Sequence, residues 1–220
     1  WDSRDQEHGG QRWFHIYGDD HVPFNDRLHW SQPLQNWNGM CADCHSTGFK
    51  RKFEPKTNQF KSIWETDNVS CASCHNADTL KTSVHNDFAW IMEDGKNTAT
   101  WSGENRDQSE IEVCAACHSR RSPLSDGFKA NDKFLDAFSP SPILMPDYFA
   151  DGQIREEDYV WGSFLQSKMY SKGVICTDCH DPHSLKLKAS GNELCGQCHL
   201  PQHFDNPEHH HHPVGSTGGL

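Results

Sequence analysis

The sequence predicts a protein built mainly of short α-helices and loops, with little β-structure and a core that aliphatic side chains do not fill alone. Leu, Ile, Val and Phe make up only 38 of the 220 residues, and the net charge is −11. Charged chains with less than roughly 20% of these residues are usually disordered. Yet the chain holds 8 Trp, 12 Phe and 10 Cys, and disordered chains are poor in aromatic residues. Either the chain does not fold, or something other than aliphatic side chains fills its interior.

The ten cysteines occur as five motifs of one form, C-x-x-C-H. Two thiols three positions apart lie on the same side of a helical turn, so they can join the two vinyl groups on one edge of a porphyrin. The adjacent His then reaches the iron, and the pattern is typical of c-type haem attachment. The sequence predicts five covalent c-type haems, with thioether bonds to Cys41, Cys44, Cys71, Cys74, Cys114, Cys117, Cys176, Cys179, Cys195 and Cys198 and proximal iron ligands His45, His75, His118, His180 and His199.

Other uses of paired cysteines fit this pattern less well. Zinc sites combine C-x-x-C units but need no His after each one. A disulfide framework does not require five identical short pairs. A thioredoxin-like motif occurs once, in a βαβ context that this sequence lacks.

Five porphyrins explain the scarcity of aliphatic residues, because each brings a large rigid apolar surface. They also place the chain outside the cytoplasm, since we expect c-type haems to be attached after export; we expect a periplasmic, extracellular or cell-surface location. The sequence contains no run of 18 apolar residues, so it predicts no membrane-spanning helix. The sequence shows no signal peptide and no initiator Met, as in a processed or truncated chain.

Eleven further histidines can supply the second axial ligand of each iron. His183 lies too close to His180 to turn over the same haem, so it favours a neighbouring one. His85 lies in a polar loop, and His15 and His29 have aromatic neighbours that can pack on a porphyrin. In the tract 209–212, one or two residues are expected to face irons, because neighbours in an extended run point to opposite sides. The predicted distal ligands are His15, His29, His85, His183 and His212, with His209 or His210 as alternatives, whereas His8, His21 and His203 are interpreted as solvated.

The motif spacing suggests one pentahaem domain over residues 1–220. Residues 1–40 contain no Cys and are expected to wrap the haems and supply ligands. Residues 41–105 would hold haems 1 and 2, and residues 106–220 would hold haems 3 to 5. The short sequence gaps predict near contact between the first and second haems and between the fourth and fifth.

Three helices are indicated. A capping-box pattern, Ser109 to Glu112, opens a helix that carries Cys114 and Cys117. Residues 156–172 are predicted to form a helix with an apolar stripe along one face, and Gly173 is expected to end it. Asn192 is placed to cap a short helix that carries Cys195 and Cys198.

Several stretches resemble the multihaem cytochrome c family related to cytochrome c554, which is often fused to tetratricopeptide repeats. They are Trp1-Asp-Ser-Arg, Gly10-Gln-Arg-Trp-Phe-His15, Leu28-His-Trp30, Asn36 to Thr47, Cys114 to Arg121, and Tyr159 to Leu187. The resemblance implies bis-His haems in close-packed pairs and an exported protein. It also implies ligand roles for His15, His29, His85, His183 and the end of the His tract.

The chain departs from this family pattern at three places. The family usually has another haem motif before the Trp1 region and a C-x-x-C-H-Met-Pro motif after the Gly-Ser-x-Gly segment. After Cys74 and His75 the chain reads Asn-Ala-Asp, whereas the family more often reads His-Gly-Pro. We therefore expect a fragment of a longer cytochrome or a shortened member.

The favoured function is electron transfer through a chain of bis-His haems, without catalysis, because a six-coordinate iron has no open site for substrate. The alternative is a multihaem reductase or oxidase of small nitrogen or sulfur compounds with one open-coordinate haem; the Lys that some such enzymes have in place of a motif His is absent. A third reading, compatible with the first, is a subunit of a cytochrome filament or complex. Expected partners are redox proteins or copies of the chain; 31 acidic against 20 basic residues disfavour nucleic acid.

Overall fold

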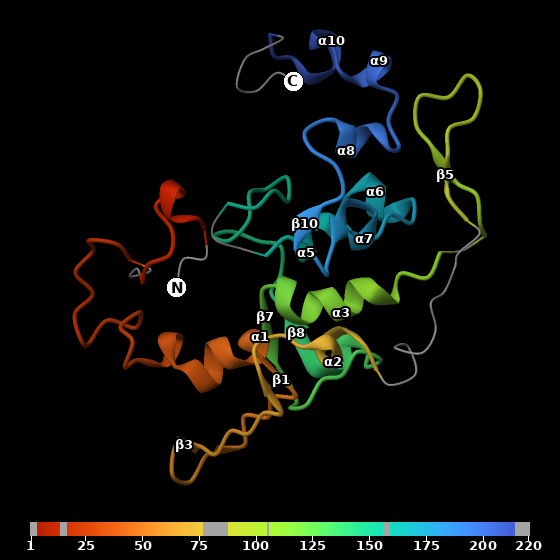
Figure 1. Cartoon of the computed structure of the whole chain (residues 1–220). Helices are drawn as coiled ribbons and strands as arrows, with labels where there is room; N and C mark the ends of the chain where they lie inside the picture. The colour runs from red at the N-terminus through yellow and green to blue at the C-terminus, as the bar shows by residue number, and fades with distance from the viewer. Residues whose placement is uncertain (1–3, 14–16, 77–87, 105, 156–158, 214–220) are drawn as a thin grey trace. The chain divides into compact units, whose positions relative to one another are not determined.

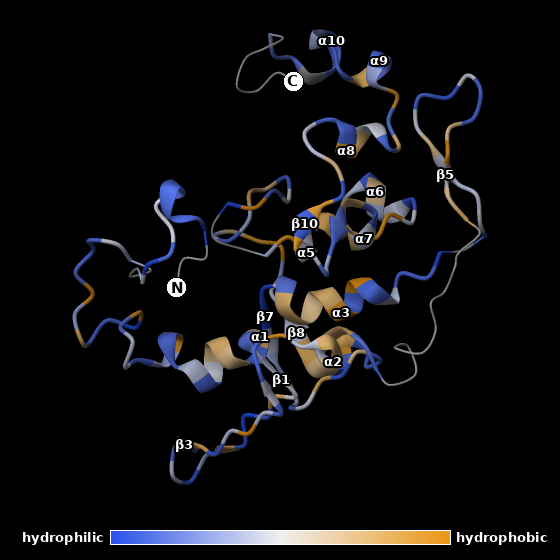
Figure 2. Ribbon diagram, viewed as in Figure 1, coloured by the Kyte–Doolittle hydropathy of each residue, from blue (hydrophilic) through white to orange (hydrophobic). Residues whose placement is uncertain are grey.

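The computed structural model describes all residues except 1–3, 14–16, 77–87, 105, 156–158 and 214–220, and it consists of short helical turns and two- or three-residue strands (Figure 1). Hydrophobic residues are spread along it in short stretches (Figure 2). Among the described residues, no helix is long and apolar enough to cross a membrane. The structure thus matches the expectation of short helices with little β-structure.

The chain divides into two units, residues 1–69 and 70–220. This boundary falls between the first and second motifs, which the sequence-based division had grouped together. The first unit contains the 3-10 helices η1 (Gln6–His8) and η2 (Pro33–Gln35), the π-helix η3 (Trp37–Cys41), α1 (Ala42–His45), and strands β1 (Ser46–Thr47), β2 (Phe53–Glu54), β3 (Gln59–Phe60) and β4 (Thr66–Asp67). β1 pairs with β4 and β2 with β3, both antiparallel.

The second unit holds the other four motifs. Its helices are α2 (Cys71–Cys74), α3 (Ser109–His118), α4 (Phe134–Ala137), α5 (Trp161–Leu165), α6 (Lys168–Ser171), α7 (Cys176–Cys179), α8 (Glu193–Gly196), α9 (Pro201–Phe204) and α10 (Pro207–His210). Its strands are β5 (Trp90–Ile91), β6 (Thr100–Trp101), β7 (Arg121–Pro123), β8 (Phe138–Pro140), β9 (His180–Asp181) and β10 (Lys186–Leu187). They form three antiparallel hairpin pairs, β5 with β6, β7 with β8 and β9 with β10.

Helix α3 forms where the sequence predicts it, but its N-terminus differs. The expected cap, Ser109, is the first helical residue, and Asp107 accepts hydrogen bonds from its N–H at 2.8 Å and its hydroxyl at 3.0 Å. Glu112 does not close a capping box; its carboxylate accepts from the N–H of Phe134 at 3.1 Å. The acidic residues of the first turn still suit the positive end of the helix dipole.

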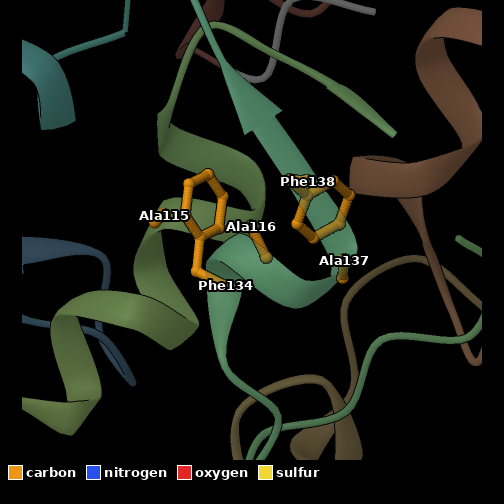
Figure 3. Close-up of a cluster of buried hydrophobic side chains, with 5 residues drawn as sticks. All are labelled: Ala115, Ala116, Phe134, Ala137 and Phe138. Atoms are coloured by element: carbon orange, nitrogen blue, oxygen red, sulfur yellow. The ribbon is translucent and has the colours of Figure 1, made fainter. Parts of the chain in front are cut away.

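The apolar side of α3 anchors a small core (Figure 3). Ala115 and Ala116 present little bulk, which lets α4 approach closely, and Phe134, Ala137 and Phe138 are buried against them. The Phe134 ring lies 5.3 Å from that of Phe138 and 4.9 Å from that of Trp161. This aromatic cluster connects α3 to α4, β8 and α5.

The stripe predicted as one helix over 156–172 is two helices. Residues 156–158 lie outside the described part of the chain, α5 ends at Leu165, and α6 starts afresh at Lys168. The break occurs because the Ser167 hydroxyl caps α6, accepting from the N–H of Tyr170 at 3.0 Å. Gly173, with φ +87°, follows α6 in the left-handed region, as expected.

The helix predicted after Asn192 is shorter than expected. Asn192 stands at its N-cap position, but its side chain makes no capping hydrogen bond. Cys195 lies in α8, whereas Cys198 follows the helix.

Candidate haem-attachment sites

We number the five C-x-x-C-H motifs 1 to 5 in chain order. In each motif a helical turn brings the two thiols to one side. The proximal His N–H closes that turn by donating to the carbonyl of the first Cys in motifs 2, 4 and 5, for example from His75 to Cys71 at 2.8 Å and from His199 to Cys195 at 2.9 Å. In motifs 1 and 3 the His is the last residue of α1 or α3. All five motifs thus have the local geometry that two-point attachment to a porphyrin edge requires.

The cysteines are free thiols, none joined in a disulfide. Burial, followed by the charge of the companion thiol, raises the pKa of Cys41 and of Cys74 above the ordinary value. Burial also raises the pKa of Cys179 and Cys198. These four thiols are therefore neutral near pH 7.

Thiols of different motifs meet in the second unit. Interaction with the Cys176 thiol of motif 4, followed by burial, raises the pKa of Cys114 in motif 3, and Cys74 of motif 2 also contributes. Cys195 of motif 5 is among the groups that raise the pKa of Cys179 in motif 4. Motifs 3 and 4, which are far apart in sequence, are therefore neighbours in the fold.

Side chains from the segment before motif 3 hold motif 4 by its two inner residues. The Glu110 carboxylate accepts from both the N–H and the hydroxyl of Thr177, each at 2.8 Å. The Arg106 guanidinium pairs with Asp178, and both side chains are almost buried. Arg106 also lies 4.0 Å from the centroid of the Trp101 ring, a cation–π distance.

Asp178 remains ionised within this contact. Burial favours its neutral form, but hydrogen bonds from Arg106 and from the N–H of Ile175 outweigh it and lower the pKa of the carboxyl. Motif 1 repeats the arrangement, because Asp43 occupies the same place in its motif and pairs with Arg51 at 2.6 Å.

Sequence analysis missed both Asp–Arg pairs because it treated the residues between the cysteines as spacers. An acidic residue directly before the second Cys of motifs 1 and 4 was the available signal.

His183 is positioned by a tight turn between β9 and β10. Asp181 accepts from the His183 N–H at 3.0 Å and from the Ser184 hydroxyl at 2.7 Å, as in an Asx-turn. The turn brings the His183 ring to 6.1 Å from the ring of His75, centroid to centroid, with 6° between the two planes. Nδ1 of His183 lies 3.7 Å from the Asp181 carboxylate, on the side where iron-ligating histidines commonly meet such a group.

The structure describes the surroundings of the other expected distal ligands only in part. His29 is half-buried, and its Nδ1 lies 2.8 Å from the Ser31 hydroxyl, which leaves Nε2 for a metal. His15 and His85 fall outside the described residues. His209 meets Phe204, whose ring also contacts those of His199 and His203 at 4.8 Å each. His212 is exposed.

The residues fit c-type haem. The donor set is two free thiols and one imidazole on each turn, and large aromatic side chains in the first unit are exposed, including Trp13 at 80%, Phe24 at 76% and Trp30 at 77%. Exposed aromatic rings of this size are unusual without an apolar partner surface.

Comparisons with known families agree with the geometry. The family described as cytochrome c554 and c-prime matches residues 25–76, and the doubled CXXCH motif family matches residues 169–203. The chain is related to the multihaem c-type cytochromes. No curated protein and no solved structure matches it. These matches support binding of c-type haem by the C-x-x-C-H motifs and a part in haem-based electron transfer.

Proposed function

We propose that this cytochrome is an electron conduit with five covalent haems, each bound on both faces by histidine, and that it does not act as an enzyme. The observation that carries the proposal is the pairing of His75 with His183. Iron in c-type haem cycles between ferric and ferrous forms, and a His on each face keeps the potential low and leaves no position for a substrate.

The His75–His183 spacing suits two ligands of one iron. A metal–imidazole bond is about 2 Å long, and a ring nitrogen lies about 1 Å from the ring centre, so two axial imidazoles have centroids about 6 Å apart. The observed 6.1 Å matches that requirement. We assign His183 as the distal ligand of the motif-2 iron, which would tie motif 4 to motif 2.

The succession of thiols supports a continuous electron path through the second unit. Cys74 and Cys176 both affect the pKa of Cys114, and Cys195 affects that of Cys179, so thiols of neighbouring motifs lie near one another. Thioether bonds at neighbouring thiols bring porphyrin edges close together. Glu110 and Arg106 fix motif 4 to the segment before motif 3, so the separation of these two attachment sites is set by side-chain contacts.

We further propose that the cytochrome works in the periplasm or at the cell surface, exchanging electrons with redox proteins or with copies of itself in a filament or complex. Attachment of c-type haem after export supports this setting.

Two measurements test the proposal. A pyridine haemochrome assay combined with the intact mass should give five haems per chain; fewer would contradict the assignment of all five motifs. Electron paramagnetic resonance of the oxidised protein should show only low-spin ferric iron. A high-spin signal that shifts on adding nitrite or hydroxylamine would instead favour a reductase or oxidase with one open-coordinate haem.

A further inference from the structure

A long β-hairpin follows directly after motif 1 and spans residues 46–67; we call it the lysine hairpin. β1 and β4 pair at its base and β2 and β3 near its tip, and reciprocal hydrogen bonds between Lys50 and Ile63, at 2.9 and 3.0 Å, continue the ladder between them. The rings of Phe53 and Phe60 meet at 5.0 Å across the strands. Backbone pairing and this ring contact give the hairpin a fixed frame.

The lysine hairpin carries a charge opposite to that of the rest of the chain. The hairpin contains four of the twelve lysines and Arg51 against Glu54, Glu65 and Asp67, a net charge of +2, and its outer part, residues 50–61, holds all five basic residues with one acidic residue. The remainder of the chain is strongly acidic, because the total is −11. Exposed side chains carry this charge: Lys50, Lys52, Lys56 and Lys61.

The base of the hairpin is fastened to the motif-1 attachment loop. Arg51 pairs with Asp43 at 2.6 Å, and these side chains are only 11% and 15% exposed. Asp43 lies between Cys41 and Cys44, so the pair joins the hairpin to the haem-attachment turn itself. Because the charges of Arg51 and Asp43 neutralise each other, the outward positive charge of the hairpin comes from its lysines.

We propose that the lysine hairpin is a docking surface for an acidic electron-transfer protein, which it holds beside the haem of motif 1. The inference rests on the proposed function. At physiological salt, charges act over about 8 Å, so a partner approaching the hairpin responds to the local lysines more than to the distant acidic residues. One electron passes from the reduced partner to the iron held by motif 1, so the partner is oxidised and the iron reduced.

The test follows electron uptake by the holoprotein from reduced flavodoxin, an acidic one-electron donor, in stopped-flow experiments across a salt series. The variant Lys50→Gln/Lys56→Gln/Lys61→Gln removes three hairpin charges from exposed positions. The matched control, Lys96→Gln/Lys129→Gln/Lys168→Gln, removes three exposed lysines outside the hairpin. Both variants change the net charge by the same amount.

For the wild type we expect a rate constant that falls about tenfold or more between low and high salt, as in electrostatically steered association. The hairpin variant should be about tenfold slower at low salt and nearly insensitive to salt, whereas the control should stay within about twofold of wild type. Equal losses in both variants, or no loss in either, would overturn the proposal.

Two further readouts separate the outcomes. Reduction of all haems by dithionite, a small donor, tests the electron-transfer function itself; if it succeeds while the hairpin variant behaves like wild type, only the docking proposal fails. Sedimentation at low salt tests for self-association. A dimer that the hairpin variant abolishes would assign the surface to a second copy of this chain and overturn the acidic redox partner.

Discussion

The ring centroids of His75 and His183 lie 6.1 Å apart with 6° between the ring planes, although 108 positions separate the two residues in sequence. His75 ends the turn of motif 2, and His183 is held by the Asx-turn after motif 4. A single iron between them would join two distant parts of the second unit, so this pair is the most direct target for mutation.

His183→Ala should convert one haem from low-spin to high-spin, because the motif-2 iron loses its distal ligand. Magnetic circular dichroism of the oxidised protein measures this change, and added imidazole should restore the low-spin signal. His203→Ala is the control, since His203 is interpreted as a non-ligand. An unchanged spectrum for His183→Ala would refute the assignment.

Asp178→Asn should raise the reduction potential of one haem, because removing a carboxylate beside motif 4 destabilises the ferric form. An increase on the order of 50 mV is expected, since charge interactions in a partly buried site amount to about 1 kcal/mol or more. A spectroelectrochemical titration measures it. Asp136→Asn, a change in an exposed carboxylate outside the motifs, should leave all potentials in place. A lower potential in Asp178→Asn would contradict the electrostatic argument.

Glu110→Gln should destabilise the holoprotein by about 1–2 kcal/mol, because an amide cannot accept from both the N–H and the hydroxyl of Thr177 as the carboxylate does. Denaturant unfolding measures the loss. Glu104→Gln, at an exposed position in the same segment, serves as the control and should change stability by less than about 0.5 kcal/mol. Equal effects of the two substitutions would show that the Thr177 contact does not stabilise the fold.

Replacing all ten cysteines with Ser should leave the chain without a stable tertiary structure. The described core is one small aromatic cluster around Phe134 and Phe138, and the aliphatic content is low. Circular dichroism and the dispersion of amide resonances report the result, with the haem-loaded wild type as reference. A dispersed, folded spectrum of the haem-free variant would show that side chains suffice for the core.

Much of the local structure could be predicted from sequence, and the tertiary contacts mostly could not. The helical turns of the motifs and the helix around Cys114 follow from short-range patterns. The break between α5 and α6 was missed because capping by Ser167 overrides an apolar stripe that reads as continuous. Hydrophobic periodicity reports burial on one face and says little about where a polar side chain ends a helix.

Haem proximity could be predicted only in part. Spacing along the chain predicted contact between the first and second haems, which stays a prediction, and between the fourth and fifth, with which the influence of Cys195 on Cys179 agrees. Motifs 3 and 4 come together only through the fold, where Glu110 accepts from Thr177 and Arg106 pairs with Asp178. Side-chain pairs between residues distant in sequence leave no periodic trace, so they appear only in the folded chain.

The closeness of Cys114 and Cys176 has a consequence for maturation. In an oxidising compartment, neighbouring thiols are converted to disulfides. A disulfide between these two residues would remove one thiol from each of two attachment sites and so prevent the loading of both. If the chain matures in the proposed compartment, haem attachment at these two motifs would compete with oxidation, and a reductant that keeps this one pair of thiols reduced would protect two sites at once.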